Sequence, residues 1–226
     1  CFKTIVSPQI QSDDFSIYVT MENSSEDIIE IIQSNDKNAN LKGLKWIMKL
    51  KKYDLHRHSG HFIIKKGYSA KNIADILNAG IQTPVKVIIN STRTTEQIAA
   101  SISSQLMLDS ATIASKLNDM DYLKSKGFDK DNVFYLIIPN TYEFYWNVSI
   151  DGFIERIIKE RDAFWNESRK EKAAKIGLSP EEVMTLASII EEETAKNDEL
   201  PIVAGLYINR LKRGMLLQAD PTVIYA

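Results

Sequence analysis

Three consecutive carboxylates, Glu191, Glu192 and Glu193, follow an apolar run in the stretch LASIIEEETAK. Carboxyl groups act as general acids and bases in many enzymes, and a partly buried carboxyl holds its proton more readily than an exposed one. Acid–base catalysis is therefore one interpretation of this run. The alternative is a structural helix whose acids pair with nearby lysine or arginine side chains.

The helix expected to carry these acids has a clear beginning. Ser179 is the expected N-cap, Pro180 suits the first helical position, and Glu182 would complete a capping box with Ser179. The predicted buried face of this helix comprises Val183, Leu186, Ala187 and Ile190.

The helical period separates the three acids. With Val183 at the origin of a wheel of about 100° per residue, Glu192 lies at about 180°, towards solvent. Glu191 and Glu193 lie about 80° to either side of Val183, on opposite flanks of the buried face. We therefore expect Glu191 and Glu193 to be half-buried, and the wheel does not choose between them.

Further polar side chains follow. DELPIVAGLYINRLKRG predicts a second helix, with Pro201 in its first turn, Gly214 at its end and a buried side of Ile202, Leu206 and Tyr207. Asn209 lies about 20° from Ile202 on the wheel, at the edge of that side. The next segment, MLLQADPTVIY, adds Gln218, Asp220 and Thr222. An acid, an amide and a polar turn in one region are typical of a carbohydrate site.

The same residues carry a family resemblance. Residues 187–194, 208–211 and 214–225 are similar to the signature of the endolytic murein transglycosylases, the YceG-like or MltG family. A match in three parts is far more specific than a lone short motif. LIIPNTYEFYW resembles a further segment of the family, with Asn140 where the family usually has aspartate.

The resemblance assigns roles to individual residues. The catalytic glutamate of the family falls on Glu191, and Glu193 matches a second glutamate that orients the motif. Glu192 falls at a variable position. The resemblance implies that the cleft is lined by Asn209, Gln218, Asp220 and Thr222.

The implied reaction is cleavage of the β-1,4 bond between N-acetylmuramic acid and N-acetylglucosamine inside a peptidoglycan strand. Glu191 would protonate the glycosidic oxygen, and the C6 hydroxyl of the sugar would attack the anomeric carbon, leaving a 1,6-anhydro end. The resemblance implies no metal or cofactor. Two alternatives remain, a non-catalytic peptidoglycan-binding or scaffold protein and a glycoside hydrolase with two carboxylates. Peptidoglycan strands are the expected partner, and cell-wall synthases are a family expectation.

The bulk composition agrees with a folded protein. The 226 residues are 44% hydrophobic and 26% charged, and the net charge of −2 excludes a general basic field for nucleic acid. No apolar run is long enough to span a membrane. Cys1 is the single cysteine, so no internal disulfide forms; a cut site, the stub after a membrane segment and a lipidation site are its three interpretations.

A strand–turn–helix pattern occurs three times, in FSIYV with EDIIEIIQ, HFIIKKGYS with AKNIADILNAG, and VKVIINSTRTT with EQIAASISSQL. The predicted N-caps are Ser25, Ser69 and Thr95, and Gly80 is expected to end the second helix. His56, His58 and His61 lie close together in LHRHSGH, which is a weak pattern for a metal site.

NLKGLKWIMKLKKY predicts an amphipathic helix. This helix has two interpretations. Its apolar side covers a small sheet, or its basic side contacts an anionic membrane or glycan surface. Its apolar side comprises Leu41, Leu44, Trp46, Ile47 and Met48, and its basic side comprises Lys42, Lys45, Lys49 and Lys52.

Downstream, SATIASKLND predicts a short helix and NVFYLIIPNTYEFYW a strand broken by Pro139. One long helix is expected over residues 150–176, ended by Gly177 and buried through Ile154, Ile157, Ile158, Phe164 and Trp165.

The predicted fold class is α+β. Residues 1–13 form an N-terminal segment, residues 14–82 resemble a LysM-like module, and residues 83–226 resemble a YceG-like catalytic domain that the family pattern implies is C-terminally incomplete. The family usually has a membrane-spanning helix before the LysM-like region. The expected location is therefore the bacterial cell envelope, with an inner-membrane anchor and the domain facing the periplasm or extracytoplasmic space.

Overall fold

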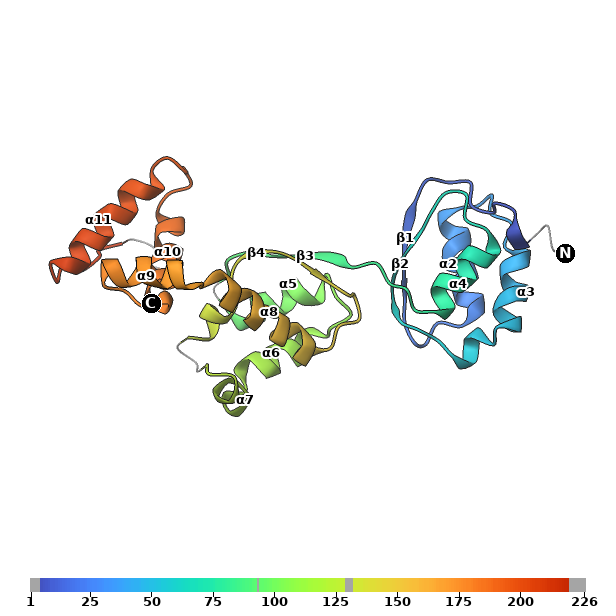
Figure 1. Ribbon diagram of the computed structural model, residues 1–226, viewed down its shortest axis with the longest axis horizontal. Coiled ribbons are helices and arrows are strands. Elements are labelled where there is room, and N and C mark those ends of the chain that lie inside the picture. The colour runs from blue at the N-terminus through green and yellow to red at the C-terminus, as the bar shows by residue number, and fades with distance from the viewer. Residues whose placement is uncertain (1–4, 93, 129–131, 220–226) are drawn as a thin grey trace. The chain divides into compact units, whose positions relative to one another are not determined.

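Helices and two small sheets make up the α+β fold of this chain (Figure 1). The computed structural model describes residues 5–92, 94–128 and 132–219. The chain divides into two compact units. The first comprises residues 1–88, 100–110 and 141–149, and the second comprises residues 89–99, 111–140 and 150–226. The LysM-like assignment and the predicted domain ranges stay predictions.

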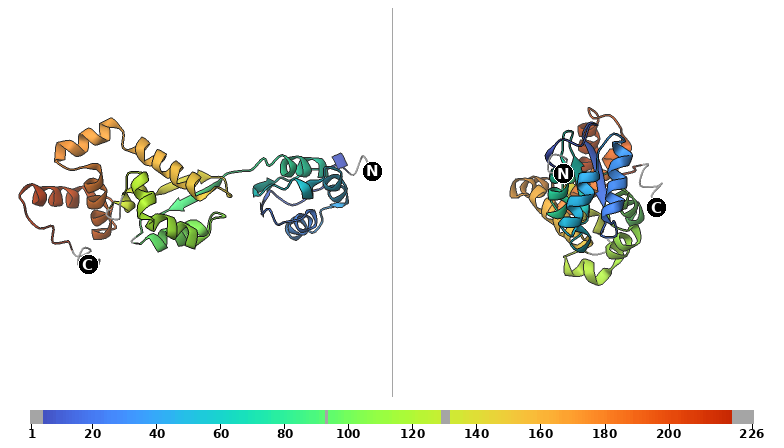
Figure 2. Two further views of the ribbon diagram at one scale, coloured as in Figure 1. Left: turned by 90° about the horizontal axis from the view of Figure 1, so that it is seen from below. Right: turned by 90° about the vertical axis from the view of Figure 1, so that its right-hand side faces the viewer.

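The first unit is built around an antiparallel pair of strands. Strand β1 (Phe15–Val19) pairs with β2 (Gly60–Ile64), with Ile17 opposite Phe62. Ile17 and Val19 are buried while Ser16 and Tyr18 face outward, as the period of two in FSIYV predicts. The helices α2 (Ser25–Asn35) and α4 (Ala70–Asn78) pack on these strands. Both helices lie on the same side of the strand pair (Figures 1 and 2).

Helix α3 (Lys42–Leu50) corrects part of the prediction for its segment. It is amphipathic, as expected, and it packs against α2 and α4 in the same hydrophobic core as the strands. Leu44, Ile47 and Met48 are buried, whereas Trp46 is 56% exposed. Trp46 lies about 100° from Ile47 on the wheel, so it cannot share the face that α2 and α4 cover.

The predicted helix starts are right in one case and wrong by one residue in two. Ser69 caps α4 in a capping box. Helix α2 is capped by Ser24, which exchanges hydrogen bonds with Asp27, while the predicted cap Ser25 instead donates to Asp54. At the third helix the Thr94 hydroxyl accepts the N–H of Gln97, so the predicted cap Thr95 is the first helical residue. In each case the cap is the residue whose oxygen reaches the third helical amide.

Gly80 and His61 have structural roles. Gly80 follows α4 with φ of 62°, the left-handed conformation that ends the helix as predicted. His61 is buried, its Nδ1 lies 2.8 Å from the Thr83 carbonyl oxygen, and its Nε2 lies 2.9 Å from Ser16 Oγ. Within the described residues no group of three or more histidine, cysteine, aspartate or glutamate side chains could hold a metal ion.

The remaining elements follow a second strand pair. Strand β3 (Val85–Ile89) pairs with β4 (Asn140–Phe144). The helices between and after them are α5 (Thr95–Ser103), α6 (Ser110–Asn118), α7 (Met120–Ser125), α8 (Ile150–Phe164), α9 (Glu167–Ile176), α10 (Pro180–Glu193) and α11 (Leu200–Lys212). The short helix predicted in SATIASKLND is confirmed as α6. None of the helices in the described ranges has both the length and the apolar character that crossing a membrane requires.

Two predicted elements are wrong in their extent. Val133–Leu136 forms a 3-10 turn, η2, and the strand begins only after Pro139, because proline has no N–H to donate to a ladder. The predicted long helix is two helices, because Asn166 accepts the N–H of Arg169 and so starts α9 anew. Gly177, with φ of 80°, ends α9 as predicted.

The carboxylate of Asp36 joins the N-terminal segment to the end of α2. Asp36 is 3% exposed, and its oxygens accept the N–H groups of Gln11 at 2.6 Å, Ser12 at 3.1 Å and Asn38 at 3.1 Å. Burial by itself raises the pKa of Asp36, but these backbone donors outweigh burial, and the pKa lies below its usual value.

We expect Asp36→Asn to lower the free energy of unfolding by about 1–3 kcal/mol at neutral pH, because it places an amide among N–H donors. The fold favours the ionised form, so this stabilisation is present above about pH 4, the value for an unfolded aspartate, and is lost as the pH falls through the lower folded pKa. Urea unfolding from neutral to acid pH measures both effects. Asp13→Asn removes an exposed carboxylate as a control, and equal stability of Asp36→Asn and wild type at neutral pH would contradict the assignment.

Candidate functional site

Helix α10 begins as the sequence predicts. Ser179 accepts the N–H of Glu182 while the Glu182 side chain accepts the N–H of Ser179, and Pro180 is the first helical residue. Leu186 and Ile190 are buried, and they contact α11, which lies alongside α10 (Figures 1 and 2). Val183 is half-buried, but Ala187 is exposed, contrary to the prediction.

All three acids at the end of α10 are exposed. This agrees with the prediction for Glu192 and corrects the half-buried positions predicted for Glu191 and Glu193. The buried stripe runs through Leu186, Ile190 and the half-buried Ile189. Its centre is therefore rotated by about 65° from Val183, away from Ala187 and Glu191. Glu193 lies nearer the stripe, but it is the last residue of α10, beyond the turns that pack.

Glu191 has a specific partner far away in the sequence. Its Oε2 accepts a hydrogen bond from Ser91 Oγ at 2.8 Å, and Ser91 lies between β3 and α5 in the same unit. Glu191 as a whole is exposed to solvent, so the contact with Ser91 holds the carboxyl group without burying it. Nothing in the sequence marks Ser91, because NSTRTT reads only as a polar turn before a helix.

The other predicted site residues lie apart from this contact. Glu193 and Asn209 are exposed, and Gln218 is exposed with φ of 52°, a left-handed conformation. Within the described part of the chain, no hydrogen bond joins Glu191 to Glu193, Asn209 or Gln218. Asp220 and Thr222 lie outside the described residues.

Helix α11 packs through a different stripe from the predicted one. Tyr207 is buried as expected, but Ile202 and Leu206 are 73% and 49% exposed. The packing residues recur at the spacing i, i+3, i+4, i+7, i+8, which describes one helical face and leaves Asn209 outside it. They are Leu200, Val203, Ala204, Tyr207 and Ile208.

The ends of the motif are held by local contacts. Thr194, at the end of α10, donates to Glu199 Oε2 at 2.8 Å, and Lys196 Nζ lies 2.9 Å from Glu199 Oε1. The pKa of Glu199 lies below its usual value, mainly because of the hydrogen bond from Lys196 and to a smaller extent because of that from the Thr194 hydroxyl. After α11, Arg210 donates to the carbonyl of Leu217. Thr194 therefore shapes the loop between the helices, and Arg210 fixes the segment that precedes Gln218.

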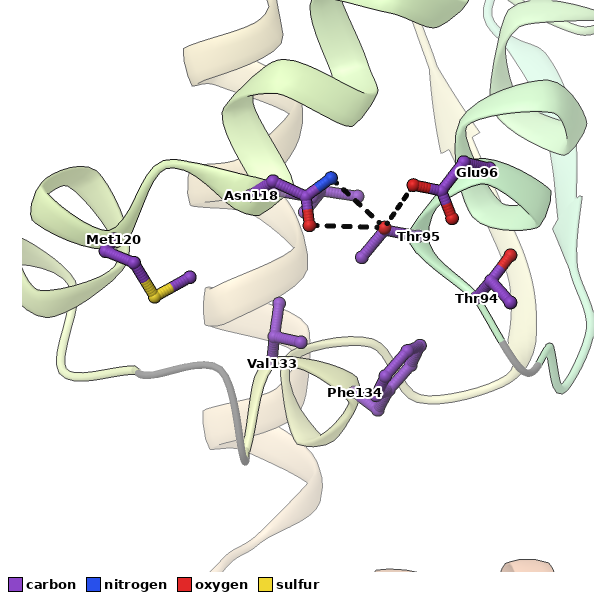
Figure 3. A pocket seen from close by; sticks show the side chains of 8 residues that line it. Thr94, Thr95, Glu96, Asn118, Met120, Val133 and Phe134 are labelled. Atoms are coloured by element: carbon purple, nitrogen blue, oxygen red, sulfur yellow. Dashed lines mark hydrogen bonds between the residues drawn. The ribbon is translucent and has the colours of Figure 1, made fainter. Parts of the chain in front are cut away.

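A cavity of about 240 Å³ lies beside the first turn of α5 (Figure 3). In Figure 3 the Thr95 hydroxyl lies between Glu96 and Asn118. It accepts from Nδ2 of Asn118 at 3.2 Å, and its single hydrogen is within reach of Oε1 of Glu96 at 3.2 Å and of Oδ1 of Asn118 at 3.3 Å. No predicted site residue lines this cavity. Its walls are Thr94, Thr95, Glu96, Leu117, Asn118, Met120, Val133 and Phe134.

Comparisons with known proteins agree with the family resemblance. Residues 17–226 match the model of the YceG-like family. A Bacillus subtilis protein named endolytic murein transglycosylase is 25% identical over 242 residues, which cover 99% of this chain and 67% of that protein. A Streptococcus pneumoniae protein of the same name is 30% identical over 93 residues, which cover 40% of this chain and 16% of that protein.

The fold is also shared with a solved structure. A crystal structure of a protein described as YceG-like from Listeria monocytogenes covers 94% of this chain and 75% of its own, with a TM-score of 0.58 and 23% sequence identity. The predicted α+β class is thereby confirmed.

Proposed function

The chain belongs to the YceG-like family, and on that premise we propose that it cleaves peptidoglycan strands internally as an endolytic lytic transglycosylase. The observation that carries the proposal is the position of Glu191. It lies in the family motif at the end of α10, it is open to a long polymer, and Ser91 holds one of its oxygens. The names of the relatives supply the substrate class, which is peptidoglycan.

The proposed reaction uses a single carboxyl group. Glu191 donates its proton to the oxygen of the β-1,4 bond between N-acetylmuramic acid and N-acetylglucosamine, and the bond from that oxygen to the anomeric carbon breaks. The C6 hydroxyl of the muramic acid then forms a new bond to the anomeric carbon and returns its proton to Glu191. The products are a free C4 hydroxyl and a 1,6-anhydro end, so no water is consumed and no cofactor takes part.

Ser91 is proposed to orient the acid. Because Ser91 Oγ donates to Oε2, the other oxygen, Oε1, is the one available to carry the proton towards the glycosidic oxygen. The Glu191 side chain is exposed to solvent in this structure. A bound sugar would exclude that water, and a carboxyl shielded from water holds its proton more readily.

A hydrolase with two carboxylates fits this arrangement less well. Such enzymes place the two carboxyl groups about 5–9.5 Å apart across the scissile bond. Glu193 lies two residues after Glu191 on one helix, so the two side chains diverge by about 160°. Glu193 is therefore proposed to support the motif, together with Asn209, Gln218, Asp220 and Thr222 as residues that line the cleft.

The same proposal assigns a location and partners. A protein that cleaves peptidoglycan acts in the cell envelope, on the extracytoplasmic side. An inner-membrane anchor and contact with cell-wall synthases are part of the proposal as family expectations.

Glu191→Gln is expected to lower the rate of cleavage of purified peptidoglycan by about 100-fold or more, because the amide cannot donate the acid proton. Release of soluble muropeptides measures the activity, and circular dichroism checks the fold. Glu192→Gln makes the same change at the next position and is expected to leave cleavage intact. Unchanged turnover by Glu191→Gln would refute the acid, and binding without any cleavage by the wild type would favour the non-catalytic alternative.

The products separate a lyase from a hydrolase. Mass spectrometry of the released muropeptides is expected to show anhydro ends, lighter than reducing ends by one water. A digest in ¹⁸O-labelled water is expected to introduce no label at the new ends. Labelled reducing ends alone would instead indicate a hydrolase.

Ser91→Ala is expected to lower turnover about 10-fold, because a hydrogen bond to a carboxyl that orients the acid is lost. Binding of strands should stay unchanged, since the hydroxyl is proposed to contact Glu191 and not the sugar. Ser91→Thr keeps a hydroxyl and should retain most of the activity, while Thr92→Ala serves as a neighbouring control. Equal turnover of Ser91→Ala and wild type would remove Ser91 from the site.

A further inference from the structure

The outer face of α3 is a surface that the proposed function does not use. Gly43, Leu44, Ile47 and Met48 point into the core of the first unit. The opposite face of α3 lies within about 80° of Lys42 on the helical wheel and comprises Lys42, Lys45, Trp46, Lys49 and Leu50. These side chains are exposed, and together with the exposed Lys52, which follows the helix, we call them the basic face.

The basic face carries an excess of positive charge. Residues 42–52 contain five lysines and no acid. Lys51 lies 3.0 Å from Asp75, and Lys45 lies 3.4 Å from Glu26. In the Lys45–Glu26 pair both side chains are more than half exposed, so the attraction is weak. The other three lysines, Lys42, Lys49 and Lys52, make no side-chain hydrogen bond or ion pair within the described residues.

Large apolar side chains lie among these lysines. Trp46 is 56% exposed and Leu50 is 65% exposed, although both belong to a helix whose other face is fully packed. Tryptophan and leucine interleaved with lysine are typical of surfaces that lie at a bilayer interface, where the indole lies at the level of the headgroups. The N-acetylated sugar rings of a glycan could stack on the indole, but the rings themselves carry no charge that would pair with the lysines.

We propose that the basic face docks on the surface of a bilayer that contains anionic phospholipids. The ammonium groups of Lys42, Lys49 and Lys52 would contact lipid phosphates, and Trp46 and Leu50 would enter the headgroup boundary. Because α3 is already packed against α2 and α4, the face exists before binding and no segment has to fold.

The size of the effect follows from the charges. Each lysine near an anionic bilayer strengthens binding by about 5.4-fold, so the three unpaired lysines together contribute about 150-fold. This contact is reversible and sensitive to salt, because the Debye length falls from about 10 Å at 0.1 M to about 3 Å at 1 M salt.

Vesicle sedimentation of the 226-residue chain tests the proposal. We expect binding at low salt to vesicles of equal parts phosphatidylcholine and phosphatidylglycerol, release at 1 M salt, and no binding to phosphatidylcholine alone. The double variant Lys42→Ala/Lys49→Ala should bind about 30-fold more weakly. Trp46→Ala should also bind more weakly and should lose the blue shift in fluorescence that the wild type shows with anionic vesicles.

The matched control is Lys172→Ala/Lys175→Ala, which removes the same charge from exposed positions on α9. It should bind as the wild type does. Absence of binding to anionic vesicles, or an equal loss in the α9 control, would overturn the proposal. Binding to peptidoglycan that depends on Trp46, without binding to vesicles, would also overturn it and assign the face to glycan.

Discussion

The contact between α10 and α11 sets the rotation of both helices, and the exposure of Glu191 on α10 and of Asn209 on α11 follows from it. On α10 the contact uses Leu186 and Ile190, one turn apart, and on α11 it centres on the buried Tyr207. A stripe this narrow covers one side of each helix only. The motif acids at the end of α10 and Asn209 on α11 are consequently presented to solvent, where a polymer can reach them.

Exposure changes how Glu191 works in the proposed reaction. A long glycan strand cannot enter a closed pocket, so an acid that cleaves inside a strand has to lie on an open surface. The shielding that an acid needs then has to come from the substrate itself. In the proposed reaction, the hydrogen bond from Ser91 fixes the orientation of the exposed carboxyl group.

The sequence allowed accurate prediction where local chemistry decides the structure. Ser179 with Glu182, Ser69 as an N-cap, and the left-handed glycines Gly80 and Gly177 are local signals, and the structure confirms each of them. The family assignment, which rests on motif residues across 187–225, was also correct. The half-buried position of Glu191 was wrong because a wheel gives angles between residues but not the direction from which a neighbouring helix packs. Ser91 could not be found from the sequence, because its partner Glu191 lies 100 residues away. The division of residues 150–176 into two helices was not predicted, because an asparagine within a helical pattern does not by itself indicate a new N-cap.

The central claim is that Glu191 faces the scissile bond. A crystal structure of the Glu191→Gln variant with a short peptidoglycan strand tests this most directly. The account predicts that the side chain at position 191 lies within about 3 Å of the glycosidic oxygen between N-acetylmuramic acid and N-acetylglucosamine, with Ser91 still bonded to its other end. A strand bound with another carboxylate nearest that oxygen, or one that does not reach the end of α10, would contradict it.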